Sequence, residues 1–304
     1  MHKLLKQAFT LIELLVVIAI VGILSGLIVV SMSGVTQKAN IAKLQVFSNS
    51  LKNSLMLNLI SEWKFDELTT AIDSTTIRDS WSGGNNGILD TNILVADTAD
   101  KVRTESSCVS GKCLYFDGVD DYVSVTDNAS LNVTTALSIE IWINRIAVSA
   151  GPASLLRRDS SDTYAISTGG AGTTTVRLRF KDSASTHHYG TLNYVSTGQW
   201  NHIVGSYDGR YIRFYINGII VSTDDIGAFT IVAGLGNLII GRDDAVSGRF
   251  FNGLIDGVRI YNAAVPLSKI KENYYAGLNS LLAKREITKQ DYQKRIGELA
   301  ITQP

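Results

Sequence analysis

The sequence has little proline, little cysteine and no surplus of charge of either sign. Three prolines occur among 304 residues, and none lies between Phe9 and Leu59, so nothing in that stretch forbids a continuous helix. The 28 basic side chains equal the 28 acidic ones, and no basic run stands out in the body, which argues against nucleic acid as a partner. Glycine, in contrast, occurs 26 times and separates short apolar runs, which predicts a β-rich body with tight turns.

The two cysteines, Cys108 and Cys113, lie close together in the segment CVSGKC. No histidine or further cysteine is placed to complete a zinc site with them. If the chain is exported, a short local disulfide is expected. The alternative is a pair of reduced cysteines at a strand edge.

The first 30 residues combine a basic lead with a long apolar run from Phe9 to Val30. The run is long enough for a membrane-spanning helix, which needs about 20 residues, and the basic lead is expected to stay on the cytoplasmic side. It is too long for the apolar region of an ordinary signal peptide, and it carries a carboxylate, Glu13. A charge within a membrane segment is costly and usually functional. The alternative is a plain anchor with a stray glutamate.

Apolar residues then recur at spacings of three and four up to about Leu59, as in Ile41, Leu44 and Phe47. We therefore predict one long helix over residues 9–60, with an apolar half (9–30) and an amphipathic half (31–60).

From Trp63 onward the pattern changes to short strands separated by turn residues, over residues 61–266. Asn217 and Gly218 between two apolar runs predict a hairpin. In LSIEIWI the isoleucines alternate with Glu140, which we expect on the exposed face. Many short strands with turn signals between them predict an antiparallel sandwich.

The tail, residues 267–304, is expected to be helical. Ser268 is a candidate N-cap and Gly277 a candidate stop for a first helix. Thr288 followed by Asp291 predicts a capping-box start for another. These helices either cover the sandwich, which we favour, or contact a neighbouring molecule.

The segment KQAFTLIELLVVIAIVGIL resembles the N-terminal methylation motif of type IV pilins and type II secretion pseudopilins. The resemblance implies that a prepilin peptidase removes residues 1–8, cutting between Ala8 and Phe9, and methylates the new amine. Ala8 stands where the family usually has glycine. Glu13 would then pair with the Phe9 amine of a neighbouring pilin subunit, since an unpaired carboxylate is expensive in an apolar setting. The implied partners are identical or related pilin subunits, the prepilin peptidase and the pilus assembly platform; the implied locations are the inner membrane and then an extracellular filament.

The body resembles the laminin G-like, concanavalin A-like sandwich family over about residues 62–275. The segments that carry the resemblance include WKFDE, DSWSGGNNGIL, GKCLYFDGVDDYVSV, QWNHIVGSYDG and FFNGLIDGVRIYNAAVPLSKI. The resemblance implies a jelly-roll of two antiparallel sheets. With the other patterns, the expected fold is mainly β, with a long N-terminal α-helix and short C-terminal helices.

Members of that family often carry a structural calcium, which takes oxygen ligands. The best match here is Asp79, Asn85 and Asn86 in the SGGNN region, facing Asp256. The family often has an acidic residue where Gly257 stands. The alternative is that Asp79 and Asn85 form turn hydrogen bonds. We expect Asp120 and Asp121 to be a turn feature as well.

Catalysis is not expected, because most sandwich glycosidases need two carboxylates at a fixed separation. The strand LSIEIWI offers Glu140 alone, and no Glu-x-Asp-x-x-Glu array occurs. His187 and His188 are interpreted as solvated residues of a polar loop.

The favoured function is a major or minor pilin-like filament subunit that displays the sandwich at the cell surface for adhesion, by binding a glycan or a protein. Loops on rigid scaffolds commonly carry recognition, and the candidate positions are Tyr164, His187, His188, Tyr189 and Arg249. A type II secretion pseudopilin is the first alternative, and a membrane-anchored glycan-active enzyme is the second.

Overall fold

The computed structural model describes residues 58–67, 76–81, 84–90, 101–103, 107–147, 152–158, 163–169, 172–243 and 249–301, which fall within one compact unit, Asn58–Pro304. The predicted processing site at Ala8 and Phe9, the predicted membrane run and Glu13 lie outside the described residues. Among the helices that are described, none combines the length and the apolar character that crossing a bilayer requires.

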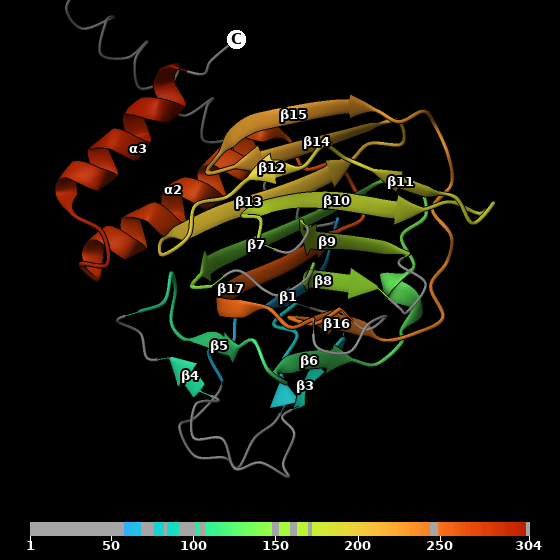
Figure 1. The fold of residues 1–304 in the computed structure, drawn as a ribbon, viewed down its shortest axis with the longest axis horizontal. Helices are drawn as coiled ribbons and strands as arrows, with labels where there is room; N and C mark the ends of the chain where they lie inside the picture. Colours follow the sequence, from blue (N-terminus) through green and yellow to red (C-terminus); the bar gives the residue numbers. More distant parts are fainter. Residues whose placement is uncertain are drawn as a thin grey trace, which may run out of the picture. The chain divides into compact units, whose positions relative to one another are not determined.

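The described strands form two sheets, labelled in Figure 1. Sheet A runs in the order β15 (Ile219–Asp225), β14 (Tyr211–Ile216), β13 (Trp200–Tyr207), β7 (Leu137–Arg145), β17 (Asn252–Tyr261), β5 (Cys113–Asp117) and β4 (Lys101–Arg103), and β1 (Leu59–Trp63) also pairs with β17. Sheet B runs in the order β11 (His187–Tyr189), β10 (Thr175–Lys181), β9 (Tyr164–Thr168), β8 (Ser154–Arg158), β16 (Leu238–Ile240), β6 (Tyr122–Val125), β3 (Gly87–Asp90) and β2 (Thr76–Ile77), and β12 (Asn193–Tyr194) also pairs with β10. A short 3-10 helix, η1 (Ala129–Leu131), follows β6. The strand pairings are antiparallel, so the predicted antiparallel sandwich is confirmed.

The main core lies between the sheets and follows from the period of two in each strand. Val176, Leu178 and Phe180 of β10 are fully buried, whereas the residues between them are only partly buried. Ile139 and Ile141 of β7 belong to the same apolar cluster.

The predicted hairpin at Asn217 and Gly218 is confirmed. Both residues have positive φ, 53° and 76°, and they join β14 to β15 as a two-residue turn. Asparagine and glycine tolerate that backbone conformation, and the turn's twist matches that of the strands.

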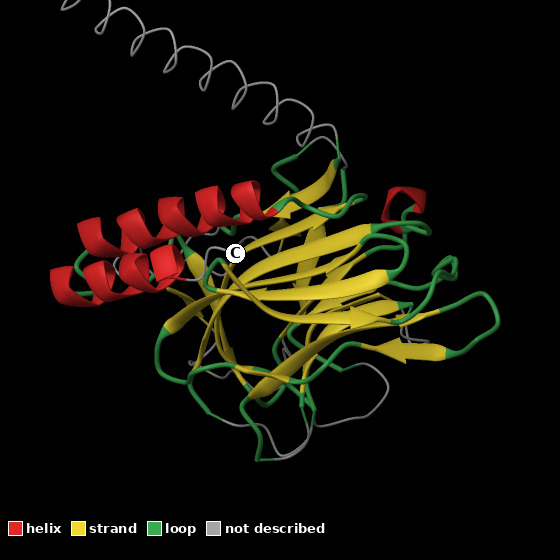
Figure 2. Ribbon diagram, turned by 90° about the horizontal axis from the view of Figure 1, so that it is seen from above, coloured by secondary structure: helices red, strands yellow, loops and turns green. Residues whose placement is uncertain are grey.

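Two helices follow the strands, α2 (Leu267–Ala283) and α3 (Lys289–Ile301), and Figure 2 shows them side by side along the sandwich. They bury a second apolar cluster against sheet A, which includes Trp142, Trp200 and Tyr274. The favoured prediction that the tail covers the sandwich is therefore confirmed.

The predicted ends of the first tail helix were wrong. Pro266 rather than Ser268 is the N-cap, and α2 continues through Gly277 to Ala283. A Cβ on Gly277 would lie 2.3 Å from Cζ2 of Trp142, so this glycine permits close packing of the helix on the sheet. The packing offsets the helix penalty of glycine, about 1 kcal/mol.

The capping box that starts α3 is confirmed. Asp291 donates its backbone N–H to Oγ1 of Thr288 at 3.0 Å, and the Asp291 carboxylate accepts from the Thr288 hydroxyl at 2.6 Å and backbone N–H at 3.3 Å.

The long N-terminal helix was predicted to reach residue 60, but the structure places Leu59 and Ile60 in β1. Leu59 pairs with Tyr261 of β17, whose ladder satisfies the backbone groups that a helix would otherwise use.

Candidate functional site

The structure brings three of the four predicted calcium residues together in one turn network. The Asp79 carboxylate accepts backbone N–H groups from Glu62 and Trp81, each at 3.0 Å, and from Asn85 at 3.2 Å. Oδ1 of Asn86 accepts the N–H of Asp79 at 2.9 Å. These are the turn hydrogen bonds that the alternative interpretation describes, and calcium binding stays a prediction.

Asp256 belongs to a different network. It stands opposite Trp142 in the β17–β7 register, and its Oδ2 accepts the backbone N–H of Ser110 at 2.9 Å. Burial raises the pKa of the Asp256 carboxyl to about 7, with a nearby carboxylate, Asp66, adding to the effect.

A cavity of about 180 Å³ lies beside Asp256, between sheet A and α2. Ser110, Trp142, Arg259 and Asn273 are among its lining residues. The cavity is large enough for several waters, and its lining combines apolar side chains such as Trp142 with the polar groups of Asp256 and Asn273.

The loop over this cavity is fixed by a disulfide between Cys108 and Cys113. Both cysteines are fully buried in the cluster that α2 covers. Lys284, at the C-terminal end of α2, donates to the backbone carbonyl of Cys108 at 3.2 Å, so the loop and the helix hold each other in place.

Glu140 is not exposed as predicted; it is fully buried beneath α2. One carboxylate oxygen accepts from His202 and Arg259 at 2.9 Å each, the other accepts from Tyr261 at 3.1 Å, and Asn273 of α2 donates to both. Burial alone would raise the pKa of Glu140, but the Arg259 charge and the hydrogen bonds from His202 and Asn273 lower it to about 2. Glu140 is therefore an ionised carboxylate that joins β7, β13, β17 and α2, and it is unsuited to proton transfer near neutral pH.

Sequence reasoning missed the partners of Glu140 because they are remote in the chain. His202 is 62 residues away and Asn273 is 133 residues away. The one local signal is a charged residue within the apolar strand LSIEIWI, and that pattern also fits a strand with one solvated face.

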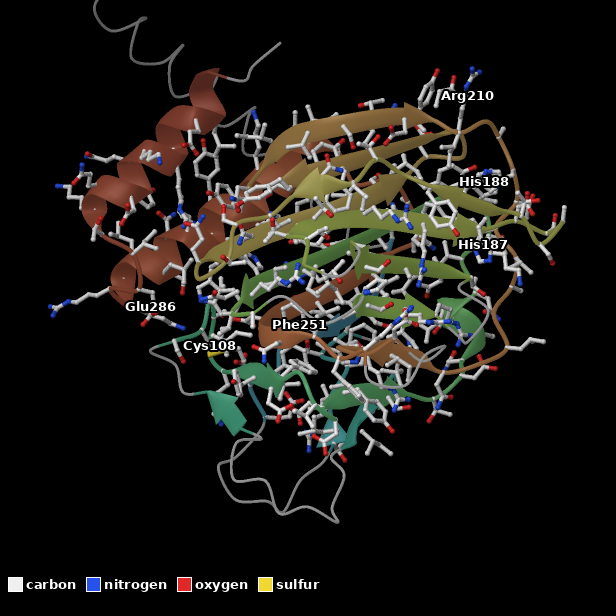
Figure 3. All side chains as sticks on the ribbon, in the orientation of Figure 1. Cys108, His187, His188, Arg210, Phe251 and Glu286 are labelled. Atoms are coloured by element: carbon white, nitrogen blue, oxygen red, sulfur yellow. A yellow bond between two sulfur atoms is a disulfide. The ribbon has the colours of Figure 1, made fainter. Side chains whose placement is uncertain are left out.

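Some positions proposed for loop recognition lie elsewhere than predicted. Tyr164 is fully buried in β9, and its hydroxyl donates to the carbonyl of Leu131 at 3.0 Å. His187 and His188 lie on β11 rather than in a loop, because that strand pairs with β10. Figure 3 shows these histidines at the opposite end of the sandwich from Cys108.

The remaining positions lie at the surface of sheet B or beside it. His188 stacks on Phe229 with ring centroids 4.0 Å apart, and its Nε2 lies 2.9 Å from the Asp182 carboxylate. The side chain of Arg249 is 34% exposed and lies 3.7 Å from the Asp243 carboxylate. Tyr189 is 43% exposed and is the one of these aromatic positions most open to a ligand.

A group of three carboxylates, from Asp117, Asp120 and Asp121, lies within 4.8 Å. Asp121 accepts the backbone N–H of Asp117 at 2.8 Å, and Asp117 accepts that of Val119 at 2.7 Å. These contacts agree with the predicted turn role.

Comparison with protein families gives two matches. The family described as the "Concanavalin A-like lectin/glucanases superfamily" matches residues 117–271, about half of the chain. The chain belongs to this superfamily. The description "Prokaryotic N-terminal methylation motif" matches residues 4–29, so both predicted resemblances are confirmed. Comparison with curated proteins finds no match.

Solved structures agree on the fold. The binding domain of Paraclostridial Mosquitocidal Protein 1 is similar with a TM-score of 0.56 and 16% identity, over 74% of this chain and 53% of that one. Domain 4 of an extracellular arabinanase from Geobacillus stearothermophilus, in complex with arabinotriose, is similar with a TM-score of 0.54 and 20% identity, over 71% of this chain and 97% of that one. The ligand-binding domain of botulinum neurotoxin serotype D, in complex with N-acetylneuraminic acid, is similar with a TM-score of 0.54 and 12% identity, over 75% of this chain and 53% of that one. The chain thus spans about half the length of the toxin domains.

Proposed function

We propose that the chain is a type IV pilin-like filament subunit that displays a carbohydrate-binding sandwich at the cell surface. The observation that carries the proposal is the methylation motif over residues 4–29 on the same chain as a lectin-like fold. The motif supports export and assembly, and the fold supports recognition.

The processing step follows from the residues of the motif. A prepilin peptidase cleaves between Ala8 and Phe9 and methylates the Phe9 amine. Glu13 then accepts that amine from a neighbouring subunit, because an isolated carboxylate in an apolar helix bundle is costly. The precursor resides in the inner membrane, and the assembled subunit is extracellular.

Binding rather than catalysis fits the sandwich. Of the three similar structures described above, one is a binding domain, one is an arabinanase domain in complex with arabinotriose, and one is a ligand-binding domain. The carboxylate of Glu140 is buried and fully ionised at neutral pH, so it offers neither an accessible nucleophile nor a general acid.

Mass spectrometry of the mature chain recovered from the cell surface tests the processing step. We expect a first residue Phe9 carrying one added methyl group. A chain that still begins at Met1 would refute the proposal. Imaging of surface filaments separates a pilin from a type II secretion pseudopilin, which the motif fits equally.

The role of Glu13 is tested by Glu13→Ala, with Thr10→Ala as a control in the same apolar run. We expect Glu13→Ala to insert into the membrane normally but to be lost from filaments, and Thr10→Ala to be incorporated. Equal incorporation of both variants would show that Glu13 has no assembly role.

A further inference from the structure

An irregularity in β17 places two charged side chains on the same face of sheet A. Asp256 pairs with Trp142 of β7, and Arg259, three residues further on, pairs with Glu140, which is only two residues from Trp142. The extra residue makes a β-bulge, which includes Gly257 with a φ of 55°. Bulges commonly lie next to active sites, where they re-aim a side chain. Residues three apart in a regular strand face opposite sides of the sheet, but here both Asp256 and Arg259 face α2.

The cavity described above lies between this bulge and α2. Its volume of about 180 Å³ exceeds that of an engineered cavity, about 150 Å³, that holds benzene, so it has room for one six-membered ring. Gly257 contributes to this room. Among the described residues beyond its chain neighbours, a Cβ on Gly257 would approach only Cδ1 of Trp142, at 3.6 Å. The lining residues of α2 are mostly small as well: Ala276, Gly277 and Ser280.

Arg259 and Asn273 line the cavity as a donor and an acceptor that are held in place. Nε and Nη1 of Arg259 donate to Glu62 and Glu140, at 2.7 and 2.9 Å. Nδ2 of Asn273 donates to both oxygens of Glu140, and because a carboxylate only accepts, this contact fixes the orientation of the amide. Within the described part of the chain, Nη2 of Arg259 and Oδ1 of Asn273 have no hydrogen-bond partner. One donor and one acceptor are therefore uncommitted.

The cavity is reached from solvent between the disulfide loop and α2, because Ser110 and Ala276, one from each side, are exposed. The backbone N–H of Ser110 donates to Oδ2 of the buried Asp256 at 2.9 Å, so this carboxyl is held in place too. The hydroxyls of Ser110 and Ser280 add groups that both donate and accept. The loop, the sheet and the helix thus each supply polar atoms to the lining.

We propose that this cavity binds a single neutral sugar ring, as the terminal residue of a glycan, with two adjacent hydroxyls on Arg259 and Asn273. The inference rests on the proposed function, and it names the place and the kind of sugar. A hydroxyl both donates and accepts, so two neighbouring hydroxyls match a donor beside an acceptor. The C–H groups of the ring contact the apolar part of the lining, which includes Val109, Ala276 and Trp142.

The charges at the cavity favour a neutral ligand. Arg259 already has two carboxylate partners, Glu62 and Glu140. A sugar acid would bring a third carboxylate to the same guanidinium, beside the buried Asp256. A cationic amine would be repelled by the guanidinium. A neutral ring avoids both costs and still uses the uncommitted donor and acceptor.

The test measures binding of neutral, acidic and cationic forms of the same sugars to the purified full chain. The probes are galactose, glucose and mannose, each with its uronate and its amino sugar. The chain is kept in a detergent without a sugar headgroup, and saturation-transfer NMR detects binding. We expect at least one neutral sugar to bind with a dissociation constant of about 1 mM or below, and its charged forms to bind at least about tenfold more weakly.

Ala276→Leu fills the cavity from α2, and Ala283→Leu is its matched control on the same helix. Both alanines are exposed, and leucine is also a good helix former, so the fold should tolerate both changes. Of the two, Ala276 lines the cavity. We expect Ala276→Leu to lower the affinity at least about tenfold and Ala283→Leu to leave it unchanged. Ser280→Ala, which removes one lining hydroxyl without adding volume, should lower the affinity about fivefold.

Unchanged sugar binding by Ala276→Leu would refute the cavity as the site, while carbohydrate binding elsewhere on the sandwich would stand. Tighter binding of a uronate or an amino sugar would refute the neutral ligand. If Ala276→Leu fails to fold, Ser280→Ala decides, and undiminished affinity then refutes the inference. A wild-type chain that binds none of the neutral sugars refutes it too, whereas mature filaments beginning at Phe9 would still support the assembly role.

Discussion

Replacing Glu140 with glutamine should destabilise the sandwich by about 3 kcal/mol at pH 7. The pKa of Glu140 falls from 4.5 to about 2 on folding, and each pKa unit corresponds to about 1.4 kcal/mol. The carboxylate is fully buried, so solvent screening does not reduce this value much. Breaking a buried charge network by removing one member commonly costs a similar amount, about 3–5 kcal/mol.

The pH dependence provides a second, independent readout. Because the folded pKa lies below the unfolded pKa, the ionised network stabilises the fold fully above pH 4.5, and this contribution is lost as pH falls toward 2. Glu140→Gln should remove that part of the acid dependence. At pH 7 the melting temperature should fall by about 6–12 °C for a domain of this size.

Calorimetry and urea unfolding of the wild type, Glu140→Gln and Glu286→Gln measure these effects. Glu286 is exposed at the turn between α2 and α3 and is the matched control for loss of one carboxylate. A loss below about 1 kcal/mol for Glu140→Gln would refute the reasoning, since the network would then contribute no more than an ordinary hydrogen bond.

Three further predictions concern Asp256, Gly277 and calcium. Because burial raises the pKa of Asp256 from 3.8 to about 7, this carboxyl weakens folding progressively as pH rises from about 4 to about 7. Asp256→Asn should therefore stabilise the fold at pH 8 by up to about 4 kcal/mol and change little at pH 4, as measured by thermal melting. Gly277→Ala should lower the melting temperature despite alanine's better helix propensity, because its Cβ would lie 2.3 Å from Trp142, while Gly297→Ala, with open space at that position, should not. If calcium occupies the Asp79 loop, a chelator should lower the melting temperature and added calcium should restore it; a melting temperature unaffected by both would exclude a structural calcium.

Features that depend on near neighbours in the chain were predictable from the sequence. Asn217 and Gly218 specify their own turn through backbone conformation, and Thr288 and Asp291 cap a helix from three residues apart. Features that depend on packing were not predictable. Gly277 is a helix stop by local rules, but in the structure it lies within α2, where its missing side chain lets the helix pack closely on Trp142.

In the candidate site, too, local features were predictable and features that depend on packing were not. The alternation of arginines in VRLRF predicts which face of β10 they occupy. The position of Tyr189 and Tyr194 beside β10 was not predictable, because it depends on how β11 and β12 pair with that strand. The Asp79 turn could be recognised from its residue types, whereas the separation of Asp256 from it depends on the position of β17 in sheet A.

The two tail helices decide which outward residues of the sandwich are buried. LSIEIWI in β7 and VRLRF in β10 are both strands whose alternate residues point away from the main core, and on sequence alone both expose those residues. In the structure the outward residues of β7 are buried, because α2 covers them and supplies Asn273 to Glu140, whereas those of β10 are only half-buried. Sheet A thus uses the outward Glu140 to hold α2 in place, whereas Arg177 and Arg179 on the outer face of sheet B are half-buried. Glu140→Gln removes the carboxylate to which Asn273 of α2 donates, and should therefore lower the stability of the fold by weakening the docking of α2 on sheet A.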